Sequence, residues 1–80
     1  MKKIKDIRAF KKYKISYLII TLDGIIDDVH AQEIGEVASG DGFGFSMLRD
    51  RRKNTTTLAF TAESIQNVLN SVSEWLKWQD

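Results

Sequence analysis

The sequence predicts a single α+β domain, in which a small antiparallel sheet of three to four strands carries an amphipathic C-terminal helix across one face. Three observations predict this fold. Residues 13–22, 43–49 and 55–61 have the composition and the two-residue side-chain period of strands. Residues 65–76 carry apolar side chains with the period of a helix. A chain of 80 residues has room for one core, and no repeat or linker divides it, so residues 1–80 are treated as one domain.

The basic N-terminal segment, residues 1–12, is predicted to form a short helix. Ile4, Ile7 and Phe10 recur at intervals of three, which places them on one narrow apolar stripe surrounded by lysines. A helix of about ten residues is marginal in isolation. This segment therefore needs another element to pack against.

Residues 13–22 are predicted to form a central strand. Ile15, Tyr17 and Ile19 lie on one face, whereas Leu18, Ile20 and Leu22 lie on the other. Because the later residues are apolar on both faces, we expect a helix to cover one face and a second surface to be buried by self-association or by a partner. Asp23-Gly24 follows, and this pair favours the two-residue turn of a hairpin.

Residues 25–38 allow two interpretations. A strand would continue the hairpin that Asp23-Gly24 predicts. A helix would use Asp27 as its N-cap and Gly40 as the residue after its end. Gly35 weakens both, and we favour extended structure, at least over residues 34–38, because the Asp-Gly turn signal is more specific than a helix stripe that a glycine interrupts.

The C-terminal half has clearer patterns. A glycine-rich loop at residues 40–42, which we expect to allow a bent hairpin, precedes a strand that ends near Arg49. A polar turn at residues 50–54 leads into a return strand, residues 55–61. Thr61 is the predicted N-cap of the last helix, with Phe60 and Ile65 as its hydrophobic staple. The apolar stripe of that helix consists of Ile65, Val68, Leu69, Val72 and Leu76, with Trp75 at its edge.

Charge is distributed in blocks behind a formal net charge of +1. Residues 1–14 contain seven basic residues and one acidic residue, residues 15–48 contain six acidic residues and no Lys or Arg, and residues 49–53 are basic again. Such blocks either bind phosphates or neutralise one another within the molecule or within a dimer. Because the overall charge is close to zero, neutralisation is the favoured interpretation.

Several chemistries lack the residues that they need. The chain has no cysteine, which excludes disulfides and thiolate metal sites and favours a cytoplasmic setting. His30 is the single histidine, and no nucleophile motif accompanies it, so we expect a structural role. Asp27 and Asp28 are expected to be turn or cap residues. We therefore expect no enzymatic activity, no cofactor, no metal site and no membrane span.

The candidate binding residues are a basic cluster and two tryptophans. Arg forks and lysines suit phosphates or carboxylates, and exposed tryptophans are common anchors in protein interfaces. Tyr13 and Tyr17 alternate with lysines, as stacking residues do, but they also lie on the apolar face of a strand, where sheet packing is expected. The predicted partner-binding residues are Arg49, Arg51, Arg52, Lys53, Trp75 and Trp78.

These residues support two functions. The first is a non-enzymatic protein-binding module, such as a small regulator, adaptor or protein inhibitor, which occupies the surface of another protein or of a second copy in a homodimer. The alternative is a nucleic-acid-binding protein that uses the basic N-terminus and the loop of residues 49–53.

Overall fold

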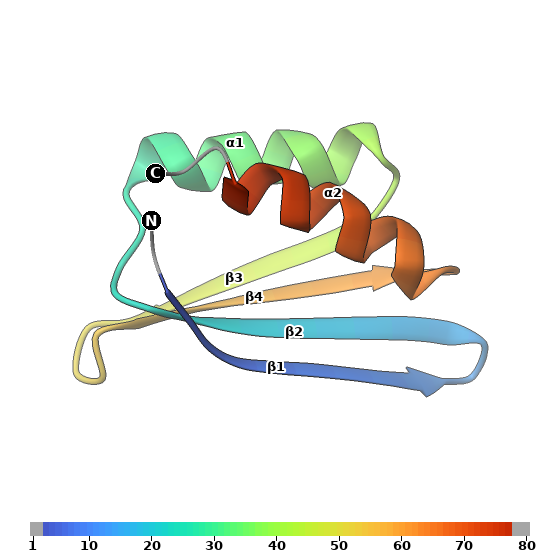
Figure 1. Ribbon diagram of the computed structural model, residues 1–80, viewed down its shortest axis with the longest axis horizontal. Helices are drawn as coiled ribbons and strands as arrows, with labels where there is room; N and C mark the ends of the chain where they lie inside the picture. The colour runs from blue at the N-terminus through green and yellow to red at the C-terminus, as the bar shows by residue number, and fades with distance from the viewer. Residues whose placement is uncertain (1–2, 78–80) are drawn as a thin grey trace.

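The computed structural model describes residues 3–77. Its four strands form one antiparallel sheet in the order β1-β2-β4-β3. Both helices lie on the same face of this sheet, and no helix or strand formed by residues 3–77 lies over the opposite face (Figure 1). The predicted α+β fold with a C-terminal helix is confirmed. The elements are β1 (Lys3–Lys12), β2 (Ile15–Asp23), α1 (Asp28–Gly40), β3 (Gly44–Asp50), β4 (Thr55–Ala62) and α2 (Ile65–Lys77).

The connection through α1 explains the strand order. β2 and β3 both pair antiparallel to β4, so they run parallel to each other with β4 between them. Parallel strands cannot be joined by a tight turn, and α1 makes the long connection between them. The result is a split β-α-β unit, to which β1 and α2 are added at the two ends of the chain.

The core lies between the helices and the covered face of the sheet. Leu18, Ile20 and Leu22 of β2 are at most 1% exposed, as the alternation predicted for this strand requires. Residues from β4 and from both helices complete the core, which confirms the predicted stripe of the last helix. These are Leu58, Phe60, Ile34, Ala38, Val68, Val72, Trp75 and Leu76, with Ile26 from the segment before α1 and with Ile65 and Leu69 partly buried beside them.

The predicted N-terminal helix is wrong, because residues 3–12 form β1. The interval of three between Ile4 and Ile7 comes from an irregularity in the strand. The register with β2 shifts between Ile4 and Asp6, so Ile4 and Ile7 both fall on the face that carries Leu22 and Ile20. Phe10 lies on the other face. A bulged strand thus imitated the period of a helix.

The hairpin turn is also displaced from its predicted place. β1 and β2 are joined by Tyr13 and Lys14, whose φ angles of 52° and 68° have the sign that a type I′ turn requires. The strand that follows therefore begins at Ile15 rather than at Tyr13. Asp23-Gly24 instead begins the connection to α1, and Gly24 uses its freedom to adopt a φ of 110°.

The extended structure favoured for residues 34–38 is wrong, and the helical alternative is right. The side chain of Asp27 accepts a hydrogen bond of 2.9 Å from the backbone N–H of His30 and caps α1 as that alternative predicted. Gly40 is the last residue of the helix. The glycine-rich segment therefore connects a helix to a strand and does not form a bent hairpin.

The second hairpin follows the prediction closely. β3 and β4 enclose the polar turn, in which the carboxylate of Asp50 accepts hydrogen bonds from the backbone N–H groups of Arg52 and Lys53 at 3.0 and 3.2 Å.

The predicted cap of the last helix is wrong, because Thr61 is still part of β4 and α2 begins at Ile65.

Candidate interaction surface on the uncovered face of the sheet

The uncovered face of the sheet carries a diagonal band of apolar side chains, called here the apolar strip. Neighbouring residues of a strand point to opposite faces, so the side chains between the buried residues of β2 point away from the helices. Cross-strand partners extend this face to the other three strands. The strip consists of Phe10 from β1, Ile15, Tyr17 and Ile19 from β2, Ala59 from β4 and Leu48 from β3.

The apolar strip is substantially open to solvent. Leu48 is 67% exposed, Phe10 48% and Ile15 43%, whereas Tyr17 and Ile19 are half-buried. The rings of Phe10 and Tyr17 stack with centroids 4.9 Å apart. Exposed apolar side chains that run together across a whole sheet are a feature of binding surfaces, whereas scattered ones are ordinary.

The β1–β2 turn lies at one end of this face. Tyr13 is 87% exposed, so the sheet packing expected for it is wrong. The Nζ atom of Lys12 lies 5.7 Å from the centre of the Tyr13 ring, within the range of a cation–π contact. Tyr17, by contrast, packs on the sheet as expected, against Phe10.

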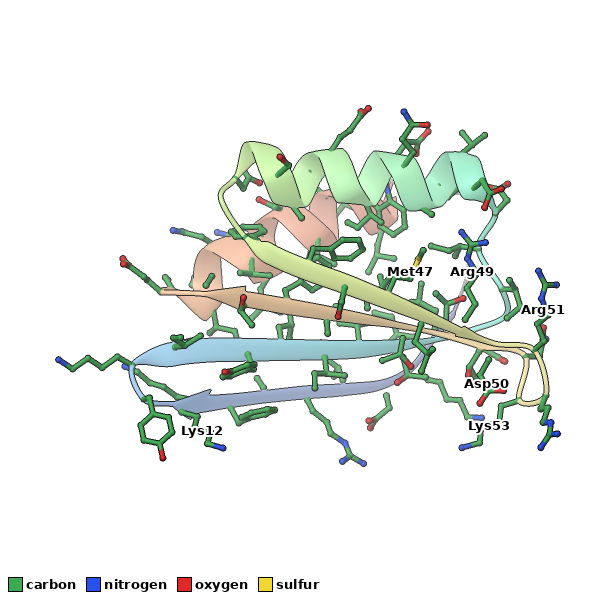
Figure 2. All side chains as sticks on the ribbon, turned by 180° about the vertical axis from the view of Figure 1, so that it is seen from behind. Lys12, Met47, Arg49, Asp50, Arg51 and Lys53 are labelled. Atoms are coloured by element: carbon green, nitrogen blue, oxygen red, sulfur yellow. The ribbon has the colours of Figure 1, made fainter. Side chains whose placement is uncertain are left out.

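The β3–β4 turn lies at the opposite end of the sheet from Lys12, and its basic residues do not act as one group (Figure 2). Arg51, Arg52 and Lys53 are exposed at the turn. Arg49 points towards the helices, where its guanidinium forms an ion pair of 2.9 Å with the carboxylate of Asp28 in the first turn of α1. Of the four predicted basic residues, Arg49 is therefore paired within the molecule.

The two basic segments of the sequence meet beside the β3–β4 turn. A shallow hollow on the uncovered face brings residues of β1 next to residues of the second hairpin, and Arg8 forms an exposed ion pair of 3.0 Å with Asp6 at its border. Three cations, Lys5, Arg8 and Lys53, outnumber two carboxylates, Asp6 and Asp50, in the lining of the hollow, so it is weakly positive. The hollow is lined by Lys5, Asp6, Arg8, Thr21, Leu48, Asp50, Lys53, Thr55 and Thr57.

Trp75, one of the two predicted tryptophan anchors, is not part of this surface. Trp75 is 7% exposed and packs in the core, not at the edge of the helix stripe. Trp78 lies outside the described residues. The surface found instead depends on β1, which the sequence did not identify as a strand. The pattern in the sequence that could have revealed β1 as a strand is the pair Phe10 and Tyr17. These two residues become cross-strand partners only if the turn is placed at residues 13–14.

Charge is segregated between the two layers of the molecule. The strands and their two hairpin turns, residues 3–23 and 44–62, contain ten basic and three acidic residues. The helices and the segments beside them, residues 24–43 and 63–77, contain one basic and seven acidic residues. An open groove between α1 and α2 is lined by Glu33, Glu36, Val37, Asp41, Ser71, Glu74 and Trp75. The sheet layer is thus positive and the helix layer negative, a polarity that the net charge conceals.

His30 and Asp27 form a capping contact at the start of α1. Nδ1 of His30 lies 2.9 Å from the Asp27 carboxylate. The hydrogen bond from the His30 backbone N–H is the main reason that the pKa of the Asp27 carboxyl lies below its usual value. The Asp27 side chain is 64% exposed and the His30 side chain 41%, and each is accounted for by its place at the helix terminus.

Within residues 3–77, no group of three His, Asp or Glu side chains could hold a metal ion. No helix formed by these residues is long and apolar enough to cross a membrane. Comparison of the chain with protein-family models, with curated proteins and with solved structures finds no match.

Proposed function

We propose that the protein is a non-enzymatic protein-interaction module, that the apolar strip is its docking surface, and that a second copy of the chain is the partner it binds when no other is present. The observation that carries this proposal is that all four strands contribute to the strip. A surface of this kind can pack against its own copy about a two-fold axis, because each copy then offers the other the same apolar band. Two sheets facing each other in this way form a sandwich.

The size of the strip sets the expected affinity. If each copy buries roughly 250 Å² of apolar surface, the gross gain at about 25 cal/mol per Å² is about 12 kcal/mol for the pair. Association costs about 4–15 kcal/mol in lost translational and rotational freedom. At the lower end of that cost the balance is about 8 kcal/mol, which corresponds to a dimer that dissociates in the micromolar range.

Two exposed apolar residues provide a matched test. Leu48 lies in the apolar strip and is 67% exposed, whereas Val29 lies on α1, in the other layer, and is 64% exposed. Both positions should accept a lysine without loss of the fold, because neither side chain is part of the core. Leu48→Lys should convert the dimer into a monomer in sedimentation equilibrium, and Val29→Lys should leave it a dimer. If the two variants have the same mass in solution, the proposal is wrong.

Nucleic-acid binding is the second candidate, and the segregation of charge favours it. The objection from the sequence was a net charge close to zero. The acidic residues responsible for that value lie mainly in the helix layer, behind the sheet, so the uncovered face can present a positive surface to phosphates. Binding that weakens steeply as salt is added, and that falls when Arg51, Arg52 and Lys53 are replaced by Ala, supports this candidate. Association between protein chains that does not weaken as salt is added supports the first candidate, the protein-interaction module.

A further inference from the structure

The β1–β2 turn has a backbone conformation that its own residues disfavour. Positive φ angles at two consecutive turn residues favour Asn-Gly or similar pairs, and a bulky residue at such an angle is uncommon. Here the two positions hold Tyr13 and Lys14, with φ angles of 52° and 68°. Asn54, at the end of the other hairpin turn, adopts a φ of 55° with a residue type that tolerates it.

The fold gains little in return for this strain. The Tyr13 ring is 87% exposed, and Lys12 supplies its cation–π contact from the neighbouring position. Strained residues persist where the surrounding structure holds them, and they cluster at functional sites. The identity of Tyr13 is therefore better explained by a ligand than by the fold.

The surroundings of the ring define the chemistry of that ligand. Lys11, Lys12 and Lys14 flank it, and residues 7–22 contain no carboxylate. Lysine is depleted in the cores of protein interfaces, whereas an exposed aromatic ring beside cations is the recurring arrangement in sites for single-stranded nucleic acid. A base can stack on the ring while the ammonium groups contact the neighbouring phosphates.

We propose that the β1–β2 turn is a contact site for single-stranded nucleic acid, in which Tyr13 stacks on a base and Lys12 and Lys14 bind the flanking phosphates. This inference rests on the second candidate function and gives it a location. The site lies at the end of the sheet opposite the basic β3–β4 turn, so a strand that reached both would run along the uncovered face (Figure 2).

The test combines two measurements on the full chain. The first is the melting temperature. The second is the affinity for a labelled oligothymidylate of about 12 nucleotides, measured by fluorescence anisotropy at several salt concentrations, with a duplex of equal length as the comparison. Tyr13→Asn removes the ring and supplies a residue that suits the turn. Tyr13→Phe keeps the ring and is the control.

Tyr13→Asn should raise the melting temperature by at least about 4 °C, because the turn loses its strain. The same variant should bind the oligonucleotide at least about tenfold more weakly, since a stacked base contributes about that factor or more. Tyr13→Phe should bind within about twofold of the unmodified protein. Lys14→Gly should also stabilise the turn and should lower the slope of log K against log salt by about 0.7, the value for one phosphate of a single strand.

The other outcomes separate the two proposals. If the unmodified protein binds the oligonucleotide and Tyr13→Asn binds it equally well, the turn is not the contact site, although nucleic-acid binding stands. If the unmodified protein binds neither probe, the second candidate function fails and this inference fails with it. Equal affinity for the duplex indicates phosphate contacts alone and contradicts the stacking role of Tyr13. If Tyr13→Asn weakens the dimer instead, the turn contacts protein.

Discussion

The ring of Phe10 stacks on the ring of Tyr17 across strands β1 and β2, with their planes 9° apart and their centroids separated by 4.9 Å. Both residues lie on the face of the sheet that the helices leave uncovered, and Phe10 is 48% exposed. The pair therefore forms an ordered aromatic surface that the core does not use. The residues of the core stabilise the fold, whereas the stacked pair of Phe10 and Tyr17 remains available to a partner.

Replacing Phe10 should affect association more than stability. An aromatic pair contributes about 0.5–1.5 kcal/mol beyond its buried area, so Phe10→Ala should lower the free energy of unfolding by about 1–2 kcal/mol. Phe60→Ala, at a core position that is 1% exposed, should cost about 3–5 kcal/mol. Urea unfolding measures both, and the account is wrong if the two changes cost the same.

The hydroxyl of Thr56 should be essential to the connection between β2 and α1. This fully buried group donates a hydrogen bond of 2.8 Å to the carbonyl oxygen of Gly24 and accepts one of 3.2 Å from the N–H of Ile26. Thr56→Val keeps the shape but leaves those backbone groups without partners, at a cost of about 1–3 kcal/mol. Thr57→Val, on the uncovered face, is the matched control and should change stability by less than about 0.5 kcal/mol in the same unfolding experiment. Equal effects would show that Thr56 does not hold this connection.

The ion pair between Arg49 and Asp28 should contribute little to stability, even though it links β3 to α1. Asp28 is 92% exposed at its side chain, so water screens the pair. A double-mutant cycle with Arg49→Ala and Asp28→Ala should give a coupling energy below about 1 kcal/mol that decreases as salt is added. A larger coupling that salt does not change would mean that the pair is shielded from solvent.

The cap of α1 should make stability depend on pH in the acid range. The pKa of the Asp27 carboxyl is lower in the folded protein than its usual value of 3.8, mainly because it accepts the His30 backbone N–H. A lowered folded-state pKa contributes stability that is present above the unfolded value and is lost as the pH falls through the folded value. Asp27→Asn, which keeps an uncharged cap, should therefore melt below the unmodified protein at pH 6, and the difference between the two melting temperatures should shrink as the pH falls below 3.8. If the difference between the two melting temperatures is the same at pH 6 and at pH 3, the ionised Asp27 carboxylate does not stabilise the cap.

The C-terminal half of the fold could be predicted because each of its patterns has a single interpretation. The alternation through Phe45 and Met47, the polar turn after Asp50 and the apolar stripe of α2 all agree with the packing that the structure contains. In these segments the conformation that the local sequence favours is also the one that packing against the rest of the fold favours. Three details differed: the glycine-rich segment follows α1 and forms no bent hairpin, Trp75 lies in the core, and Thr61 belongs to β4, whereas α2 begins at Ile65.

The N-terminal half could not be predicted in this way, because two local signals there are misleading. The bulge near Lys5 gives β1 the residue interval of a helix, and Asp23-Gly24 offers a better hairpin turn than Tyr13-Lys14 does. The candidate surface depended on the same errors. Phe10 joins Tyr17 only in the observed register, so a helical assignment for residues 1–12 concealed the apolar strip.

The most direct test of the docking proposal is the mass of the unmodified protein in solution. Sedimentation equilibrium should be measured from about 1 to 200 µM, since the expected dissociation constant falls in this range. Measurement at about 0.15 and 1 M salt separates apolar association from charge pairing, which salt screens. We predict a mass that rises to twice the 9.2 kDa of the chain and that does not fall as salt is added, because salt screens the repulsion between two positive sheet layers. A mass of 9.2 kDa at every concentration and both salt levels would contradict the account.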